Sequence, residues 1–245
     1  MTDEAAAPTI QTVQRAALIL NAFTVSRPHL SLNEITTHLG ASKATAHRYT
    51  KALRAANLLR YDERTALYSL GPQVLTLAAT ARAGLPIVTT AEPFLERLVK
   101  LTDETAVLSV WDGEGAVVVR CADNTDQLVR ISVRAGARLD LTGSAQGRVF
   151  CALLPPGQVA SLPRVLRGRP ELRRELDLIR THGVSTNSPT LNGVRTLAAP
   201  VFEGETLTAT LAVIGTTVRI PDAIDSDIAR TLVKVAGELS AQLGT

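Results

Sequence analysis

With 245 residues and 45% hydrophobic composition, the chain is long enough for two ordinary domains, and its formal net charge is +3. No apolar run reaches the roughly 18–20 residues that a bilayer-spanning helix needs, and the N-terminus lacks a signal peptide, so we expect a cytoplasmic protein without a membrane partner. The two cysteines and four histidines lack metal-ligand spacing, which predicts no metal, no cofactor and free thiols, with a disulfide as the alternative.

A short segment precedes the first ordered domain. Residues 1–9 are acidic and alanine-rich, so we expect a disordered tail there. Apolar spacing then predicts a helix over residues 11–23, at the start of a domain that spans residues 10–71. The side chains predicted to face inward are Val13, Ala16, Ala17 and Leu20.

A helix-turn-helix is the clearest signal in the chain. Ser31 and Glu34 have the spacing of a capping box at the start of a helix over residues 31–39. Gly40 is expected to end that helix, because glycine adopts positive φ at little cost. Ser42 is then the N-cap of a second helix over residues 42–56. Two helices joined by such a short turn form the unit that places one helix in the DNA major groove.

The second helix has one face for packing and another for DNA. Its outward face combines small side chains with long cations, and the N-terminal half of such a helix contacts base edges. An ordinary solvated basic face is the alternative. Arg48 is the predicted base contact, and Lys43 and Lys51 are predicted phosphate contacts. The full set of predicted DNA contacts is Ser42, Lys43, Ala44, Thr45, His47, Arg48, Lys51 and Arg64.

A β-hairpin follows and is interpreted as the wing of the motif. Residues 58–61 and 66–70 are apolar and aromatic, with a polar turn between them. Arg64 at the turn is placed to reach a phosphate or the minor groove, an ordinary exposed loop arginine being the alternative. Residues 1–70 hold eight lysines and arginines against five acidic residues, whereas the rest of the chain is balanced. A basic module on a neutral body indicates double-stranded DNA as a partner.

A linker helix is predicted over residues 72–84, with an apolar face where subunits of a homodimer or homotetramer can meet. That face consists of Val74, Leu77, Ala78 and Ala81. The second domain is expected over residues 85–245, and its hairpins predict an α+β fold around an antiparallel sheet. Its predicted strands cover residues 105–111, 116–121, 128–133, 196–202 and 207–214. Its predicted helices cover residues 86–100, 144–154, 171–182 and 222–243.

Several segments together resemble the IclR family of transcriptional regulators. They are TVQRAALILNAF, the helix-turn-helix, TGSAQGRVFCALL and GVRTLAAPVFEGETLTATLAVIG, and the resemblance extends over about residues 9–244. It implies a winged helix-turn-helix, a linker helix and a GAF-like α/β effector-binding domain. It also implies dimers or tetramers that respond to small organic or aromatic acids, acting as repressors or activators.

A small-molecule site is predicted where residues 143–147 open a helix. Free amides and the positive dipole end can hold a carboxylate there, and Ser144 or Gln146 can add a donor. A capped helix packed in a core is the alternative. With the positions that the resemblance adds, the predicted effector contacts are Leu128, Ile131, Leu139, Ser144, Ala145, Gln146, Thr186, Val194, Thr196, Ala212 and Ile214.

Two departures from the family pattern bear on the effector. Residues 185–189 read STNSP where the family often has acidic residues, and Ala212 and Ile214 stand where small hydroxyl side chains are common. Fewer polar groups predict an effector that is more apolar than a two- or three-carbon acid.

Two other classes of function are alternatives to a regulator that responds to an effector. A hydrolase using Ser144 would need a G-x-S-x-G elbow, but positions 142 and 146 are Thr and Gln, so the chain is not expected to be an enzyme. An architectural DNA-binding protein without an effector is the second alternative. A filled core in the second domain would favour it, and a ligand cavity there would count against it.

Overall fold

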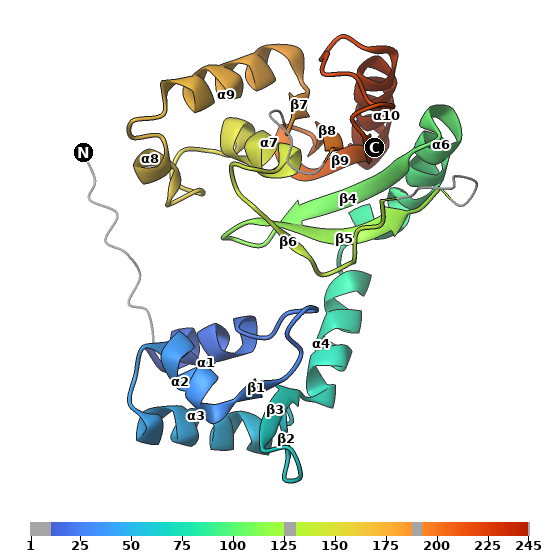
Figure 1. Cartoon of the computed structure of the whole chain (residues 1–245). Helices are drawn as coiled ribbons and strands as arrows, with labels where there is room; N and C mark the ends of the chain where they lie inside the picture. Colours follow the sequence, from blue (N-terminus) through green and yellow to red (C-terminus); the bar gives the residue numbers. More distant parts are fainter. Residues whose placement is uncertain (1–10, 125–130, 188–192, 245) are drawn as a thin grey trace. The chain divides into compact units, whose positions relative to one another are not determined.

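The structure is a computed structural model that describes residues 11–124, 131–187 and 193–244. The chain forms two compact units, Met1–Gly84 and Leu85–Thr245, each of which is described by itself (Figure 1). No single helix in the described ranges has the length and apolar character to cross a membrane. One bent pair, Pro72–Ala83 with Pro86–Thr102, meets that test by length and composition only.

The first unit is a helix-turn-helix with a small sheet. Its elements are α1 (Gln11–Asn21), β1 (Leu30–Ser31), α2 (Leu32–Leu39), α3 (Lys43–Ala55), β2 (Leu59–Asp62), β3 (Leu67–Leu70) and α4 (Pro72–Ala83). The antiparallel sheet has the order β1-β3-β2. The predicted wing is therefore present, and β1, which the sequence pattern does not predict, adds a third strand through pairing of Leu30 with Tyr68.

The packing face of α1 differs from the predicted one. Ile19 and Phe23 are buried in the core of this unit, with Ala16 and Leu20 partly buried beside them. Val13 is 64% exposed and Ala17 is also exposed, so the prediction that they face inward was wrong. The buried stripe follows the same i, i+3, i+4, i+7 spacing, but it begins three residues later, where α1 meets α2 and α3.

The second unit is an α+β domain built on one antiparallel sheet. Its helices are α5 (Pro86–Thr90), α6 (Glu92–Thr102), α7 (Ala145–Leu153), α8 (Leu162–Val165), α9 (Pro170–His182) and α10 (Asp227–Leu243). Its strands are β4 (Thr105–Trp111), β5 (Ala116–Ala122), β6 (Arg138–Leu139), β7 (Ser185–Thr186), β8 (Val194–Glu203) and β9 (Thr206–Thr216). The strand order is β6-β5-β4-β9-β8-β7.

Helices cover both faces of this sheet (Figure 1). Helices α6 and α10 pack on one face, where alternate residues of β9 such as Leu211 and Val213 are buried. Helix α7 packs on the other face, beside Ala212 and Ile214, and α9 packs against α7. The period-2 alternation of the strands thus supplies two separate cores.

Three predicted elements of the second unit need correction. Residues 131–133 are not a strand, and residues 125–130 lie outside the described residues; the short β6 pairs with β5 on the side opposite β4. The helix expected over 86–100 is divided into α5 and α6, because Pro93 lacks the N–H that would continue a helical ladder. Helix α10 begins at Asp227 rather than at 222, after Ser226 as N-cap.

Candidate functional site

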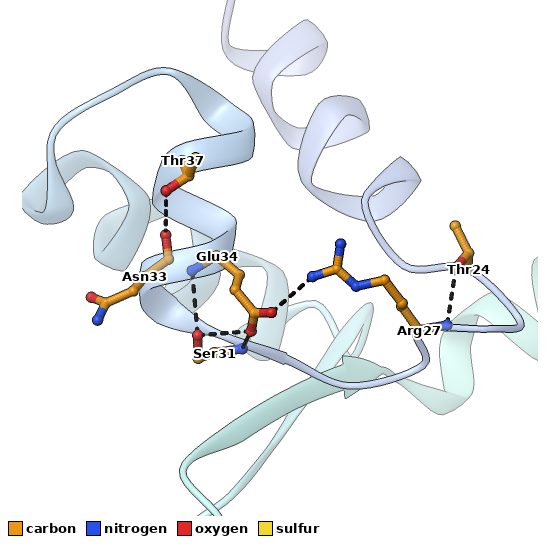
Figure 2. Close-up of polar contacts among 6 residues, drawn as sticks. All are labelled: Thr24, Arg27, Ser31, Asn33, Glu34 and Thr37. Atoms are coloured by element: carbon orange, nitrogen blue, oxygen red, sulfur yellow. Dashed lines mark hydrogen bonds and ion pairs between the residues drawn. The ribbon is translucent and has the colours of Figure 1, made fainter.

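The start of α2 contains the predicted capping box (Figure 2). The Ser31 hydroxyl accepts the Glu34 N–H at 3.3 Å, and the Glu34 carboxylate accepts the Ser31 N–H at 2.8 Å. Arg27 donates to the same carboxylate at 2.8 Å. Chiefly the hydrogen bond from the Ser31 backbone lowers the pKa of Glu34. Gly40 ends α2 with a φ of 61°. Helix α2 is therefore capped at both ends, and the turn that leads to α3 starts at Gly40.

Helix α3 separates a buried face from an exposed one. Ser42 is its N-cap and accepts the Thr45 N–H at 3.2 Å. Ala46, Tyr49 and Leu53 are buried in the core. The predicted DNA contacts on the helix and wing are exposed except for the half-buried Thr45; the exposed ones are Ser42, Lys43, Ala44, His47, Arg48, Lys51 and Arg64.

The cations of α3 are available to a partner. Among the described residues, Lys43, Arg48 and Lys51 have no carboxylate partner, and the Arg48 guanidinium lies 5.9 Å from the centre of the Tyr49 ring. An unpaired cation on an exposed helix face can bind a phosphate or a base edge without first breaking an ion pair.

The wing has a defined tip. The Tyr61 and Tyr68 rings lie 4.7 Å apart between its strands. At the turn, the Arg64 N–H donates to the Asp62 carboxylate at 2.9 Å, and this bond is the main cause of the lowered pKa of Asp62. The exposed side chain of Arg64 therefore belongs to a turn that the backbone N–H of Arg64 helps to hold in place.

The loop before α7 is closely packed. Ser144, the N-cap, accepts the Gly147 N–H at 3.0 Å and donates its hydroxyl hydrogen to the Asp140 carbonyl at 2.6 Å. The Asp140 carboxylate accepts the N–H groups of Thr142 and Gly143. A Cβ on Gly147 would lie 2.4 Å from the Leu141 carbonyl oxygen, so only glycine fits there. The hydroxyl donor of Ser144 is thus used within the loop itself.

Donors remain at the first turn of α7. Within the described ranges, the N–H groups of Ala145 and Gln146 make no hydrogen bond. The Gln146 side chain is only 2% exposed, and its Nε2 likewise has no partner there. Buried donors without acceptors are costly, which makes this turn a place where an acceptor from a ligand is favoured.

An apolar surface lies beside these donors. One cluster between α7 and the sheet contains six of the predicted effector contacts: Ile131, Leu139, Ala145, Val194, Ala212 and Ile214. Thr196 belongs to the same face, since it alternates with Leu197, which is buried on the opposite face. Thr186 pairs with Leu197 at the edge of the sheet and lies outside this cluster. Leu128 lies outside the described residues.

A cavity of about 110 Å³ lies next to this region, between α7, α9 and β7. Of the predicted contacts only Thr186 lines it, together with Arg148, Glu175 and Ser185. Arg148 is mostly buried; it donates to the carbonyls of Thr142 and Thr186 and pairs with Glu175 at 3.1 Å. Arg148, Glu175 and Ser185 are not among the predicted contacts, although a lone arginine within the apolar run of α7 is a signal of such a buried polar link.

The nucleophiles of this unit are not activated. The Ser144 hydroxyl is held between Gly147 and Asp140, and burial raises the pKa of Cys121 to about 11 and of Cys151 to about 12. Both thiols are free and protonated at neutral pH. The described residues contain no group of three or more His, Cys, Asp or Glu side chains placed to hold a metal ion.

Comparisons with known proteins agree with this architecture. Residues 79–241 match the model of the bacterial transcriptional regulator IclR C-terminal domain, and residues 12–63 match that of the IclR helix-turn-helix domain. The chain is 30% identical to the HTH-type transcriptional regulator BhcR of Paracoccus denitrificans, over 94% of this chain and 86% of that protein.

Solved structures show the same fold. An IclR family transcriptional regulator from Brucella abortus superposes with a TM-score of 0.82 at 22% identity, covering 96% of this chain and 93% of that one. An IclR homolog from Microbacterium hydrocarbonoxydans, complexed with 4-hydroxybenzoate, has a TM-score of 0.72 at 18% identity and covers 95% and 98% of the two chains.

Proposed function

The chain belongs to the IclR family of bacterial transcriptional regulators, and we propose that a small, largely apolar organic acid modulates its affinity for a double-stranded DNA operator. The first unit binds the operator and the second binds the acid. Repression and activation are both compatible with this scheme, since either conformational state can be the one that binds DNA more tightly.

The exposed face of α3 supports the DNA part of the proposal. Arg48 lies near the N-terminal half of α3 and can donate two hydrogen bonds to a guanine. Lys43 and Lys51 flank it as phosphate contacts, and Arg64 on the wing can reach the backbone or the minor groove. Small side chains such as Ala44 permit the close approach that these contacts need.

The first turn of α7 carries the effector part. The unpaired amides of Ala145 and Gln146 and the buried amide group of Gln146 are donors suited to a carboxylate, at the positive end of a helix dipole. The apolar face with Ile131, Val194 and Ile214 suits the body of the acid. Apolar walls with a few converging donors are the usual form of such sites. An aromatic acid is a reasonable member of this class, as in the Microbacterium homolog with 4-hydroxybenzoate.

A homodimer or homotetramer fits the uncovered surface of α4. No residue of α4 is buried, and Leu75 and Leu77 are 74% and 53% exposed. The face predicted from the sequence, with Val74 and Leu77, is widened by Leu75. A two-fold assembly presents two recognition helices to symmetric half-sites. Light scattering tests this proposal: two or four chains are expected, and a monomer at micromolar concentration would contradict it.

The alternatives are less well supported. The relatives are named as transcriptional regulators, which argues against the hydrolase. The unpaired donors on α7 argue against an architectural protein with a fully satisfied core. Operator DNA lies in the bacterial cytoplasm, which supports a cytoplasmic location for a regulator that binds it.

A thermal-shift screen of aromatic, aliphatic and short hydrophilic acids tests the class of effector. Aromatic or branched aliphatic acids are expected to raise the unfolding temperature of the whole chain, because they bind only the folded state. If only short hydrophilic acids stabilise the protein, the prediction of a largely apolar effector is wrong.

A further inference from the structure

Arginines of the second unit fall into two groups. Within the described residues, eight of them pair with a carboxylate, as Arg97, Arg138 and Arg219 do. Between residues 164 and 174, however, five exposed arginines have no carboxylate partner in the part of the chain that the structure describes. We call them the arginine patch: Arg164, Arg167, Arg169, Arg173 and Arg174. Glu171 is the single acidic residue in this stretch, whose net charge is +4.

An apolar groove adjoins the arginine patch. It has a volume of about 410 Å³ and is lined mainly by leucines and prolines between residues 154 and 166, such as Leu162 and Leu166. Arg173 lines its edge, beside Arg180. The guanidinium of Arg180 is already engaged by the Ala152 carbonyl and the Asp177 carboxylate, whereas Arg173 makes no such contact within the described residues. The groove therefore has an apolar floor and a cationic rim.

This surface is on the outer layer of the second unit. The arginine patch lies on helix α8, the segment after it and the start of α9, and these two helices are on the side of α7 that faces away from the sheet (Figure 1). The surface is distinct from the first turn of α7 and from the cavity at Arg148 and Glu175.

We infer that the arginine patch and its groove bind an acidic segment of a partner protein that inserts an apolar side chain between its carboxylates. The guanidinium group of arginine can form two parallel hydrogen bonds with one carboxylate, and arginine is enriched in protein interfaces. An apolar anchor in a pocket, surrounded by charged contacts, is the common arrangement of such interfaces. Nucleic acid is the less suitable occupant, because a phosphate backbone has no group that fills the apolar floor.

Fluorescence anisotropy with labelled synthetic peptides tests this inference on the full-length protein. The probes are short Asp/Glu-rich peptides with Leu and Phe at helical or at alternating spacing, and matched peptides in which Ser replaces Leu and Phe. The patch variant carries Arg167→Gln, Arg173→Gln and Arg174→Gln. The control variant carries Lys100→Gln, Arg134→Gln and Lys234→Gln, which remove the same charge from exposed sites elsewhere on this unit.

At least one acidic peptide with apolar residues is expected to bind the native protein about tenfold more tightly than its serine counterpart, and the patch variant is expected to lose about tenfold in affinity for it. The control variant should lose less than about twofold. Equal loss in both variants, equal binding of the serine peptides, or no binding of any peptide would overturn the inference. A patch-dependent affinity for unrelated duplex DNA that exceeds the affinity for every peptide would overturn it in favour of a DNA contact.

Discussion

Helices α3 and α7 carry the two proposed binding surfaces, and they are built in opposite ways. Both begin at a serine N-cap, Ser42 and Ser144. Yet α3 exposes its binding face to solvent, whereas eight of the nine residues of α7 are buried. An exposed face is defined by the helix's own sequence. A buried site is defined by the strands and loops that surround it.

The largest expected effect is at Gly147, whose close packing against Leu141 is what seats α7. Gly147→Ala should lower the free energy of unfolding by about 3 kcal/mol, because the new Cβ meets backbone atoms that cannot move aside. Gly237→Ala in α10 is the matched control, since nothing lies within 4 Å of its Cβ position; it should raise stability by roughly 0.5–1 kcal/mol. Urea denaturation measures both changes. Equal effects of the two variants would show that the loop before α7 is not tightly packed.

Gln146 tests the buried site on α7. Gln146→Leu removes an unpaired buried amide, so the stability of the free protein should be unchanged or slightly higher. Affinity for a stabilising acid should fall by about 1.5–3 kcal/mol, the usual worth of a hydrogen bond to a charged group. Calorimetric titration with the acid measures this loss. Unaltered acid affinity would remove Gln146 from the site.

Arg48 tests the exposed face of α3. Arg48→Ala should weaken operator binding by about 1–3 kcal/mol and relax the preference for one base pair. Arg54→Ala is the control, because Arg54 stacks on Tyr61 at 5.2 Å and lies outside the predicted contact set. Anisotropy titrations with the operator and with single-base variants measure both. Unchanged binding by a folded Arg48→Ala protein would contradict the assignment.

The smallest expected effect concerns the capping box of α2. Hydrogen bonding lowers the pKa of Glu34, so its carboxylate stabilises the fold above the ordinary pKa of 4.5 and loses that contribution as the pH falls through the lowered value. Native protein should therefore be more stable than Glu34→Gln at neutral pH, and the difference should shrink below pH 4.5. Thermal unfolding across this range checks the trend, with Glu63→Gln on the wing turn as control. A difference that grows on acidification has the wrong sign.

The same contrast explains what the sequence could and could not predict. Ser31, Gly40 and Ser42 act within a few residues of themselves, so the boundaries of α2 and α3 follow from local rules. Short elements such as β6 and β7 depend on partners that are distant in the chain, and no local pattern marks them. Ala212 and Ile214 were chosen from the family resemblance, and their alternate positions in β9 place both in the apolar cluster beside α7. Their contact with an effector stays a prediction.

At the α7 site, the sequence does not predict which residues of β7 and β8 pair, or which side-chain donors are already used by hydrogen bonds within the protein. Thr186 was assigned to the site from the family resemblance; it pairs with Leu197 at the edge of the sheet and lines the cavity with Arg148, outside the apolar cluster beside α7. Ser144 was expected to offer a donor, but Asp140 takes that hydrogen in the folded loop. Both outcomes depend on contacts that form only in the tertiary structure.

Operator titration with and without a stabilising acid, on a duplex selected by the protein itself, measures whether the second unit controls DNA binding. We expect the acid to change operator affinity by about 1–3 kcal/mol, in either direction, and to be recovered unaltered. The Gln146→Leu protein should bind the same operator normally in the absence of the acid and respond much less to it. If an acid that stabilises the protein leaves operator affinity unchanged, the second unit is not the switch and the proposed function is contradicted.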